Sequence, residues 1–153
     1  MKTLIKTLFA FLTLTMVGCA DNNTSLDEAL LDVTPHNIAG TWKLESWSGK
    51  TLAPTSYVYV EFIRADRTFA IYQNIDSMGD CRLLTGRYNI EIDAAKGAII
   101  RGQYDYGDVW AHRYIVTDLT ADRMVWTATD DSADISVYVR AEIPSNVKAE
   151  AKR

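Results

Sequence analysis

The sequence predicts an all-β protein, an eight-stranded antiparallel up-and-down β-barrel. Eight segments rich in β-branched and aromatic residues follow one another between residues 40 and 143, separated by turn formers. Apolar and polar residues alternate in most of them, as in strands with one buried face. No connection is long enough for the helix of a parallel crossover, so neighbours pair as hairpins, and closing the ring removes exposed edges. A two-sheet sandwich is the rival arrangement, but it would usually need longer connections between its sheets.

The first eighteen residues have the pattern of a signal peptide. Lys2 and Lys6 give a positive start, and the apolar run 8–17 that follows is too short, at about ten residues, to span a bilayer. The run ends in Met16-Val17-Gly18-Cys19, which resembles the lipobox of bacterial lipoproteins. That resemblance implies cleavage before Cys19 and acylation of its thiol and new amino group with fatty acids such as palmitate. The alternative is an ordinary signal peptide whose cysteine is incidental.

A lipid on Cys19 would anchor the chain in the cell envelope, and we expect the outer membrane, at its periplasmic or surface face. Loss of residues 1–18 leaves 14 basic against 20 acidic residues, so the formal net charge becomes −6 instead of −4. An acidic chain without a cluster of Lys and Arg is a poor binder of nucleic acid and of anionic lipid headgroups. With Cys19 acylated, Cys81 has no disulfide partner, so the apolar core must hold the fold.

The chain divides into four parts. Residues 1–18 are the signal peptide, 19–37 a lipidated flexible tether with a turn ended by Pro35, 38–143 the barrel, and 144–153 a tail that is frayed or forms a short helix. The expected strands of the barrel are Gly40–Ser48, Ser56–Arg64, Arg67–Ile75, Arg82–Ile92, Gly97–Tyr104, Val109–Asp118, Arg123–Thr129 and Asp134–Ile143.

Alternation with a period of two residues assigns an inner face to these strands. The residues predicted to point inward are Trp42, Leu44, Ser46, Val58, Val60, Phe62, Phe69, Ile71, Gln73, Ile75, Leu84, Tyr88, Ile90, Tyr104, Trp110, His112, Tyr114, Val116, Met124, Trp126, Ile135, Val137 and Val139. Tyr57, Tyr59 and Tyr72 are predicted to point outward, as are Tyr138 and Arg140 on the last strand.

Three short motifs carry a resemblance to a known family. Gly40-Thr41-Trp42 looks like the Gly-x-Trp motif that opens the first strand of lipocalins. Thr117-Asp118 resembles their second motif, Thr-Asp-Tyr, with Leu119 where tyrosine is usual, and Arg140 resembles the third-motif arginine that packs on the tryptophan. The likeness covers about residues 38–143 and is nearest to the small lipocalin-like lipoproteins of gut anaerobes.

The placement of these motifs strengthens the resemblance. Consecutive turns of an eight-stranded meander alternate between the two ends of the barrel. The start of the first strand, the turn after Asp118 and the end of the last strand therefore fall at one end. We expect Trp42 and Arg140 to meet there, as the closed end of a lipocalin requires.

The same parity places four loops at the opposite, open end: 49–55, 76–81, 105–108 and 130–133. The loops and their margins hold seven aspartates, namely Asp76, Asp80, Asp105, Asp108, Asp130, Asp131 and Asp134. A negatively charged rim favours a cationic ligand, a calcium ion or a basic partner. The alternative is that aspartate is simply a common turn former, and no twelve-residue calcium loop is present.

The inner face near the open end predicts a ligand pocket, because a few polar groups lie there among aromatic rings. The candidate ligand-binding residues are Ser46, Gln73, Tyr88, Tyr104, Trp110, His112, Tyr114 and Trp126. Eight aromatic residues on the predicted inner face would, however, largely fill an eight-stranded barrel. An internal site and a self-filled core therefore both remain open at this point.

The sequence offers little that is typical of catalysis. Its two histidines, His36 and His112, lack the clustered ligands of a zinc site, and His112 beside Asp105 or Asp108 is the one candidate acid–base pair. No cofactor motif is present. We expect no enzyme but a membrane-anchored protein that binds a small apolar or amphipathic molecule. The alternative is an interaction module that displays loops and outward tyrosines to a protein or glycan.

Overall fold

The computed structural model describes residues 28–77 and 79–151, so the predicted signal peptide, Cys19 and the first part of the tether lie outside the described residues. The elements are β1 (Gly40–Trp47), β2 (Lys50–Thr51), β3 (Val58–Ile63), β4 (Thr68–Gln73), β5 (Arg82–Asp93), β6 (Gly97–Tyr104), β7 (Tyr114–Thr117), β8 (Arg123–Ala128), β9 (Ile135–Arg140) and α1 (Ser145–Glu150). Within these ranges no helix has the length and apolar character needed to cross a membrane.

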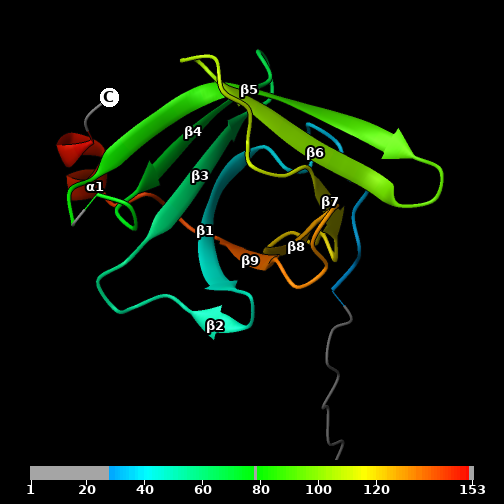
Figure 1. Ribbon diagram of the computed structural model, residues 1–153, viewed down its shortest axis with the longest axis horizontal. Coiled ribbons are helices and arrows are strands. Elements are labelled where there is room, and N and C mark those ends of the chain that lie inside the picture. Colours follow the sequence, from blue (N-terminus) through cyan, green and yellow to red (C-terminus); the bar gives the residue numbers. More distant parts are fainter. Residues whose placement is uncertain (1–27, 78, 152–153) are drawn as a thin grey trace, which may run out of the picture.

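The strands close into a barrel (Figure 1). Each strand from β3 to β9 pairs antiparallel with the next, and β1 pairs with β3 on one side and with β9 on the other. The two-residue β2 pairs only with the end of β1. The predicted closed, eight-stranded antiparallel barrel is confirmed, and the sandwich is excluded because β1 and β9 share a ladder.

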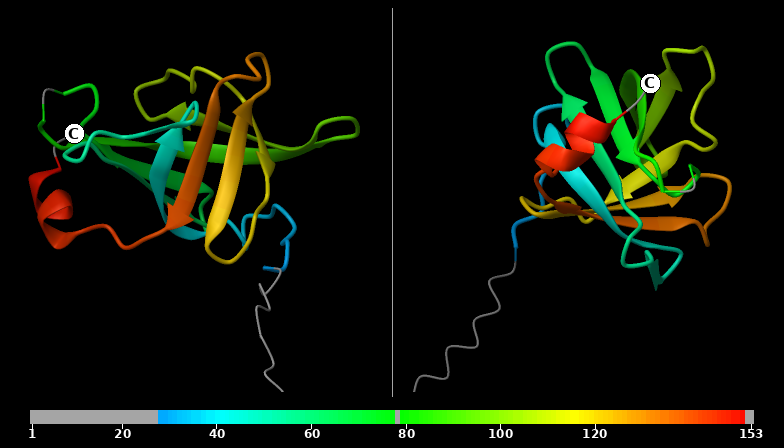
Figure 2. Two further views of the ribbon diagram at one scale, coloured as in Figure 1. Left: turned by 90° about the horizontal axis from the view of Figure 1, so that it is seen from below. Right: turned by 90° about the vertical axis from the view of Figure 1, so that its left-hand side faces the viewer.

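The barrel has two distinct ends, which we call the floor and the mouth. β1 begins and β9 ends at the floor, whereas the loop between β8 and β9 lies at the mouth. In the left-hand view of Figure 2 the N-terminal segment lies at the lower end of the barrel, and the β8–β9 loop lies at the upper end. The long β5–β6 hairpin projects from the side.

Within residues 28–37, predicted as part of the flexible tether, the segment from Leu31 onward contacts the floor, whereas 28–30 are exposed. The amide of Leu31 donates to the carbonyl of Leu119 at 2.7 Å, and Val33 packs against the barrel core. The amide of Ile38 donates to the carbonyl of Thr34 at 3.0 Å, so the turn contains Pro35 instead of ending there as predicted. This part of the predicted tether is therefore a packed part of the domain.

The face assigned to β9 was wrong. Met124 pairs with Tyr138 and Trp126 pairs with Ser136, and directly opposed residues in an antiparallel ladder share a face. Ser136, Tyr138 and Arg140 therefore point inward, whereas the predicted set, Ile135, Val137 and Val139, points outward. The alternation pattern predicted the wrong inner face because the outward residues Ile135, Val137 and Val139 are themselves apolar. Val139 is half-buried, and it lines a groove beneath the loop 51–56.

A bulge in β1 changes the face of its last residues. Leu44 pairs with Tyr138 but Ser46 pairs with Val137, so Glu45 is an extra residue in the ladder. Trp47 then stands opposite the inward Ser136, and Ser46 points away from the lumen. The inward orientation predicted for Ser46 is therefore wrong, and Trp47 takes its place.

The predicted strand Val109–Asp118 is broken. Val109 forms an isolated bridge with Gln103, and regular pairing resumes only where Tyr114 meets Ile100. Residues 111–113 lie outside the ladder between these two points. His112 is therefore carried on an irregular segment at the mouth and not on a strand.

A second, smaller core lies on the outside of the barrel. Val147 of α1 and Ile143 pack with Tyr59 and Cys81, and all four are buried. The outward tyrosines 57 and 72 pack against the same group, and α1 lies beside β3 and β4 in Figure 1. The tail is thus a short helix, and it covers the tyrosines that the interaction-module hypothesis had assigned to a partner. Tyr59 is only 8% exposed.

Candidate functional site

The floor is closed by one tryptophan and one arginine. Trp42 is fully buried and donates its Nε1–H to the carbonyl of Ile38 at 2.8 Å. The guanidinium of Arg140 lies 3.7 Å from the centroid of the Trp42 ring. Its Nη2 donates to the carbonyl of Asn37 at 2.8 Å, and its Nε donates to that of Ala121 at 3.0 Å. Burial lowers the pKa of Arg140, but the guanidinium remains charged.

Gly40 and the turn after β7, which carry the rest of the three motifs, support the contact between Trp42 and Arg140 in different ways. Gly40 has φ +100°, and a Cβ there would lie 2.8 Å from Nη1 of Arg140, so the position requires glycine. The turn after β7 reaches the floor through the buried Leu119 and through Ala121. The side chains of Thr117 and Asp118 are exposed. The predicted meeting of Trp42 and Arg140 is confirmed.

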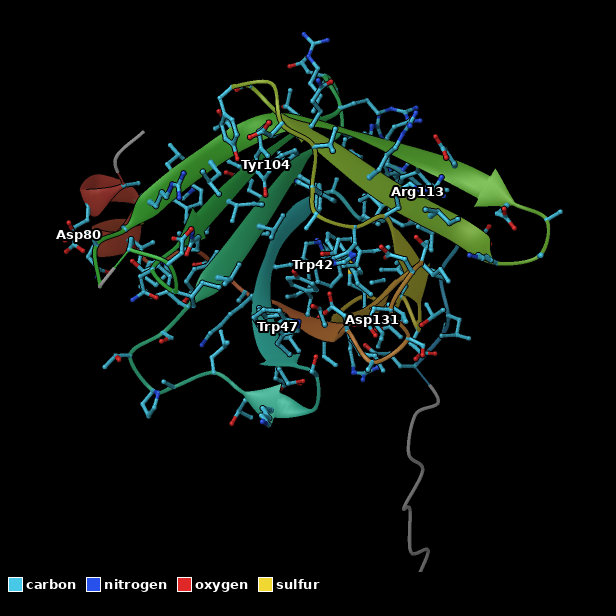
Figure 3. The ribbon with its side chains drawn as sticks, viewed as in Figure 1. Trp42, Trp47, Asp80, Tyr104, Arg113 and Asp131 are labelled. Atoms are coloured by element: carbon cyan, nitrogen blue, oxygen red, sulfur yellow. The ribbon has the colours of Figure 1, made fainter. Side chains whose placement is uncertain are left out.

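Above Trp42 the lower lumen is solid. Phe62 lies edge-on to Tyr88 with ring centroids 5.0 Å apart, and the same distance separates Phe69 from Trp110. Met124 is fully buried between these rings and the floor. Figure 3 shows Trp42 inside the ring of strands, with Trp47 beside the far end of β1. This half of the barrel is filled by its own side chains.

The upper half holds two adjoining cavities. The one at the mouth has a volume of about 260 Å³, and the deeper one has about 160 Å³. They share five lining residues, namely Val58, Ile71, Tyr104, Tyr114 and Tyr138. The lumen is therefore neither empty nor completely filled, and its open part is lined mainly by aromatic and aliphatic side chains, with Gln73, Asp76, Asp134 and Ser136 at the mouth.

Most of the predicted ligand-binding residues line these cavities. Gln73 lies at the mouth, Tyr104 and Tyr114 line both cavities, and Trp110 and Trp126 line the deeper one. The remaining three do not line the cavities. Ser46 points outward after the bulge, Tyr88 lies in the filled lower lumen, and His112 bonds to Asp130 in the loop before β9.

Trp47 and Tyr138 are the two aromatic wall residues that sequence reasoning missed. Trp47 lines the mouth cavity while remaining 49% exposed, and Tyr138 lines both cavities and packs on Trp126 with ring centroids 4.8 Å apart. The bulge that exchanges Ser46 for Trp47 has no local signal in the sequence. Tyr138 was hidden by the three β-branched residues that alternate with it.

Trp110 is seated against the backbone of β6. A Cβ on Gly102 would lie 2.1 Å from the Trp110 ring, so only glycine lets the indole approach this closely. The Nε1–H of Trp110 is buried without a hydrogen-bond partner, as is the hydroxyl of Tyr88. Burial of unsatisfied donors is costly, and of these two residues only Trp110 lines a lumen cavity, whereas Tyr88 lies in the filled lower half.

The tyrosine hydroxyls of the cavity wall are neutral donors at physiological pH. Burial, with a smaller contribution from the charge of Asp134, raises the pKa of Tyr114 to about 12. Burial also raises the pKa values of Tyr104 and Tyr138 above the ordinary value. The wall therefore offers apolar faces together with a few hydroxyl groups.

The rim carries three carboxylates in different settings. Asp76 forms an ion pair with Arg82 at 3.0 Å, and Asp130 accepts from Nδ1 of His112 at 2.8 Å. Asp134 accepts from Nε1 of Trp47 at 2.5 Å, and its other oxygen lies 3.8 Å from Nε2 of His112.

The candidate acid–base pair of His112 with Asp105 or Asp108 does not form, since His112 bonds to Asp130 instead. Asp105 instead accepts from the hydroxyl of Thr85 at 2.5 Å. Among residues 28–77 and 79–151, no group of three or more His, Cys, Asp or Glu side chains is arranged to hold a metal ion.

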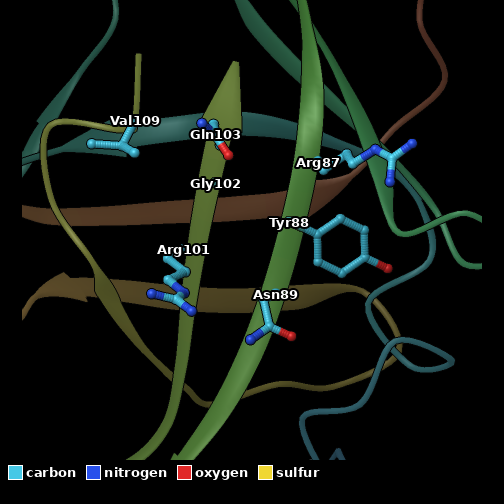
Figure 4. Close-up of a pocket in the computed structure, with 7 residues that line it drawn as sticks. All are labelled: Arg87, Tyr88, Asn89, Arg101, Gly102, Gln103 and Val109. Carbon is cyan, nitrogen blue, oxygen red and sulfur yellow. The ribbon is translucent and has the colours of Figure 1, made fainter. Parts of the chain in front are cut away.

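A separate groove of about 290 Å³ lies on the outer side of the β5–β6 hairpin (Figure 4). Arg87 and Asn89 come from β5, Arg101 and Gln103 come from β6, and Val109 closes one side. These side chains are exposed, and Arg101 is already paired with Glu91 at 2.8 Å. The groove is a polar surface on the outside of the barrel, whereas the two lumen cavities lie among the inward-facing side chains.

A closed antiparallel barrel with a tryptophan–arginine floor and a cavity at its open end defines a protein of the lipocalin type. Residues 38–126 match the family model of the lipocalin-like domain, which is more than half of the chain. The protein therefore belongs to the lipocalin-like domain family. The match ends in β8, so β9 and its Arg140 complete the family architecture in the structure alone. A comparison with curated proteins found no match.

Proposed function

We propose that the protein binds a small apolar or amphipathic molecule in the upper lumen and acts as a carrier or receptor instead of an enzyme. The cavity at the mouth carries this proposal. Its volume of about 260 Å³, continued by the deeper 160 Å³, approaches the lower range of small-molecule sites, about 300 Å³. Rigid aromatic walls favour an apolar group, and the tyrosine hydroxyls favour a polar end.

The neutral dye N-phenyl-1-naphthylamine tests this proposal, because its emission rises when it leaves water for an apolar site. We expect saturable enhancement with the wild type. Ile71→Trp would abolish it, since Ile71 lines both cavities and a larger side chain would fill them. The same change at Ile92, which is 76% exposed on the hairpin, is the control and leaves binding intact.

Two results would contradict the proposal. One is dye binding that survives Ile71→Trp in a protein whose thermal unfolding is unchanged, because the dye would then bind elsewhere. The other is the absence of any saturable signal with the wild type.

We also propose that the mature chain is a lipoprotein, acylated at Cys19 and held in the cell envelope. Eight residues, 20–27, separate Cys19 from Glu28, a span of at most about 32 Å over nine fully extended steps. Residues 28–37 lie at the floor, so an anchor there would leave the mouth facing away from the membrane. The ligand would then enter from the aqueous side.

Metabolic labelling with a radioactive or alkyne-bearing palmitate tests the anchor. We expect label in the membrane fraction for the wild type and none for Cys19→Ser. Cys81→Ser is the matched control, and it keeps the label because Cys81 is buried in the small outer core. Label that persists in Cys19→Ser would contradict acylation at this residue.

A further inference from the structure

The charges that line the lumen are all of one sign. The two cavities are lined by Asp76 and Asp134, and their linings include no Lys, Arg or His among the residues that the structure describes. Asp76 is matched by Arg82 at 3.0 Å. Within the same described ranges, no Lys or Arg forms an ion pair with Asp134. The negative charge of Asp134 therefore has no Lys or Arg partner in the described residues and is available to a cationic group of a ligand.

Asp134 is also held in place and largely removed from water. Its side chain is only 14% exposed. The Nε1–H of Trp47 fixes one carboxylate oxygen at 2.5 Å, and the backbone amide of Asp134 donates to the carbonyl of Asp131 at 3.1 Å. His112, its nearest basic neighbour at 3.8 Å, already binds Asp130 at 2.8 Å. A charge in such a setting acts more strongly on a ligand than an exposed charge does.

Four aromatic residues stand around this carboxylate in the mouth cavity: Trp47, Tyr104, Tyr114 and Tyr138. The faces of aromatic rings carry partial negative charge, and they attract organic cations from which water has been removed. Neutral tyrosine hydroxyls add no positive charge. Rings and carboxylate therefore favour the same kind of ligand group.

We propose that the ligand of the upper lumen carries an ammonium group, which lies against Asp134 among these rings while its apolar part enters the deeper cavity. This inference rests on the proposed function and narrows it to cationic amphiphiles, such as alkyl or aralkyl amines and quaternary ammonium compounds.

Three probes with one chain length test the proposal: octyltrimethylammonium, 1-octanol and octanoate, each below its aggregation concentration. Binding is measured by calorimetry and by tryptophan emission. We expect the cation to bind about tenfold more tightly than the alcohol and octanoate to bind most weakly. In Asp134→Asn the cation falls to the affinity of the alcohol, whereas 1-octanol binds as before, which shows that the cavity is intact.

Asp131→Asn is the matched control. Asp131 lies in the same loop and is exposed, and its carboxylate accepts from the backbone amide of Ala133 at 2.9 Å, a bond that asparagine can keep. It removes the same unit of charge outside the cavity, so the cation should still bind tightly. Tyr104→Leu removes one aromatic face but leaves the wall apolar, and it should lower the ratio of the affinity for the cation to the affinity for 1-octanol.

The outcomes separate the two proposals. If 1-octanol binds and the cation has no advantage, or if Asp131→Asn weakens the cation as much as Asp134→Asn, the ammonium site is wrong while the apolar cavity stands. If none of the three probes binds, the lumen is not a ligand site, and both proposals fail.

Discussion

The floor of this barrel and the lumen above it both combine aromatic rings with charged side chains. They differ in whether the buried polar groups have hydrogen-bond or ion-pair partners. At the floor, Trp42 has a hydrogen-bond partner, and Arg140 has three carbonyl partners and a ring beneath it. In the lumen above the floor, the indole N–H of Trp110 and the hydroxyl of Tyr88 are buried without a partner, and at the mouth Asp134 has no Lys or Arg partner among the described residues. The contrast indicates that the floor stabilises the fold, and it supports the ligand site that we propose at the mouth.

The largest effect should come from the floor. Trp42→Ala removes a fully buried ring on which the guanidinium of Arg140 packs. We expect it to lower the free energy of unfolding by ~3–5 kcal/mol. Urea denaturation followed by circular dichroism measures this. Trp47→Ala is the control at the mouth, where the ring is 49% exposed, and it should cost far less. Equal losses would mean that the two ends do not differ in the way proposed.

A smaller loss should follow Arg140→Met. Methionine keeps an apolar chain over Trp42, but it leaves the carbonyls of Asn37 and Ala39 without their donor. We expect a loss of about 2 kcal/mol, because hydrogen bonds from charged groups contribute more than neutral ones. Arg87→Met on the exposed outer face should be nearly neutral in the same urea experiment. A neutral Arg140→Met would show that the floor contact is not what stabilises this end.

Gly102→Ala should reduce both the stability of the fold and the binding of ligand at the mouth. The new Cβ would overlap the Trp110 ring and push the indole toward the deeper cavity. We expect destabilisation of ~1–3 kcal/mol, as in overpacked cores, together with weaker dye binding. Dye titration and urea denaturation of the same sample measure the two effects. Normal dye affinity with reduced stability would show that Trp110 does not border the ligand.

The smallest effect concerns the exposed rim. The hydrogen bond from His112 lowers the pKa of Asp130 below its ordinary value. A carboxyl whose pKa is depressed in the folded state contributes stability above the ordinary pKa, and this is lost as the pH falls through the lowered value. In carboxyl-carbon NMR titrations, His112→Ala should therefore raise the pKa of Asp130, whereas His36→Ala should not. An unchanged pKa of Asp130 in His112→Ala would show that the hydrogen bond from His112 does not lower it.

The sequence predicted the floor better than the mouth. Trp42 and Arg140 were assigned from motifs whose placement follows from counting turns, and strand order is insensitive to small local errors. The wall of the mouth depends on register instead. One extra residue, Glu45, exchanged Ser46 for Trp47, and the ladder with β8 turned Tyr138 inward against the alternation of Ile135, Val137 and Val139.

The outer surface was the other gap. The outward tyrosines were visible in the sequence, but the six residues of α1 that cover them have no strand or strong helix pattern. Short helices take most of their stability from packing, and here that packing comes from Val147 against Tyr59 and Cys81. Such a contact joins distant parts of the chain, so local sequence patterns could not reveal it.

The indole N–H signals of the four tryptophans offer the most direct test of the central claim, that the barrel is closed at the floor and binds its ligand at the mouth. Proton–nitrogen NMR spectra would be recorded during a titration with octyltrimethylammonium. We predict that the signals of Trp47 and Trp110 move while that of Trp42, bound to the carbonyl of Ile38, stays in place. Equal movement of the Trp42 signal, or no movement at Trp47 and Trp110, would contradict the claim.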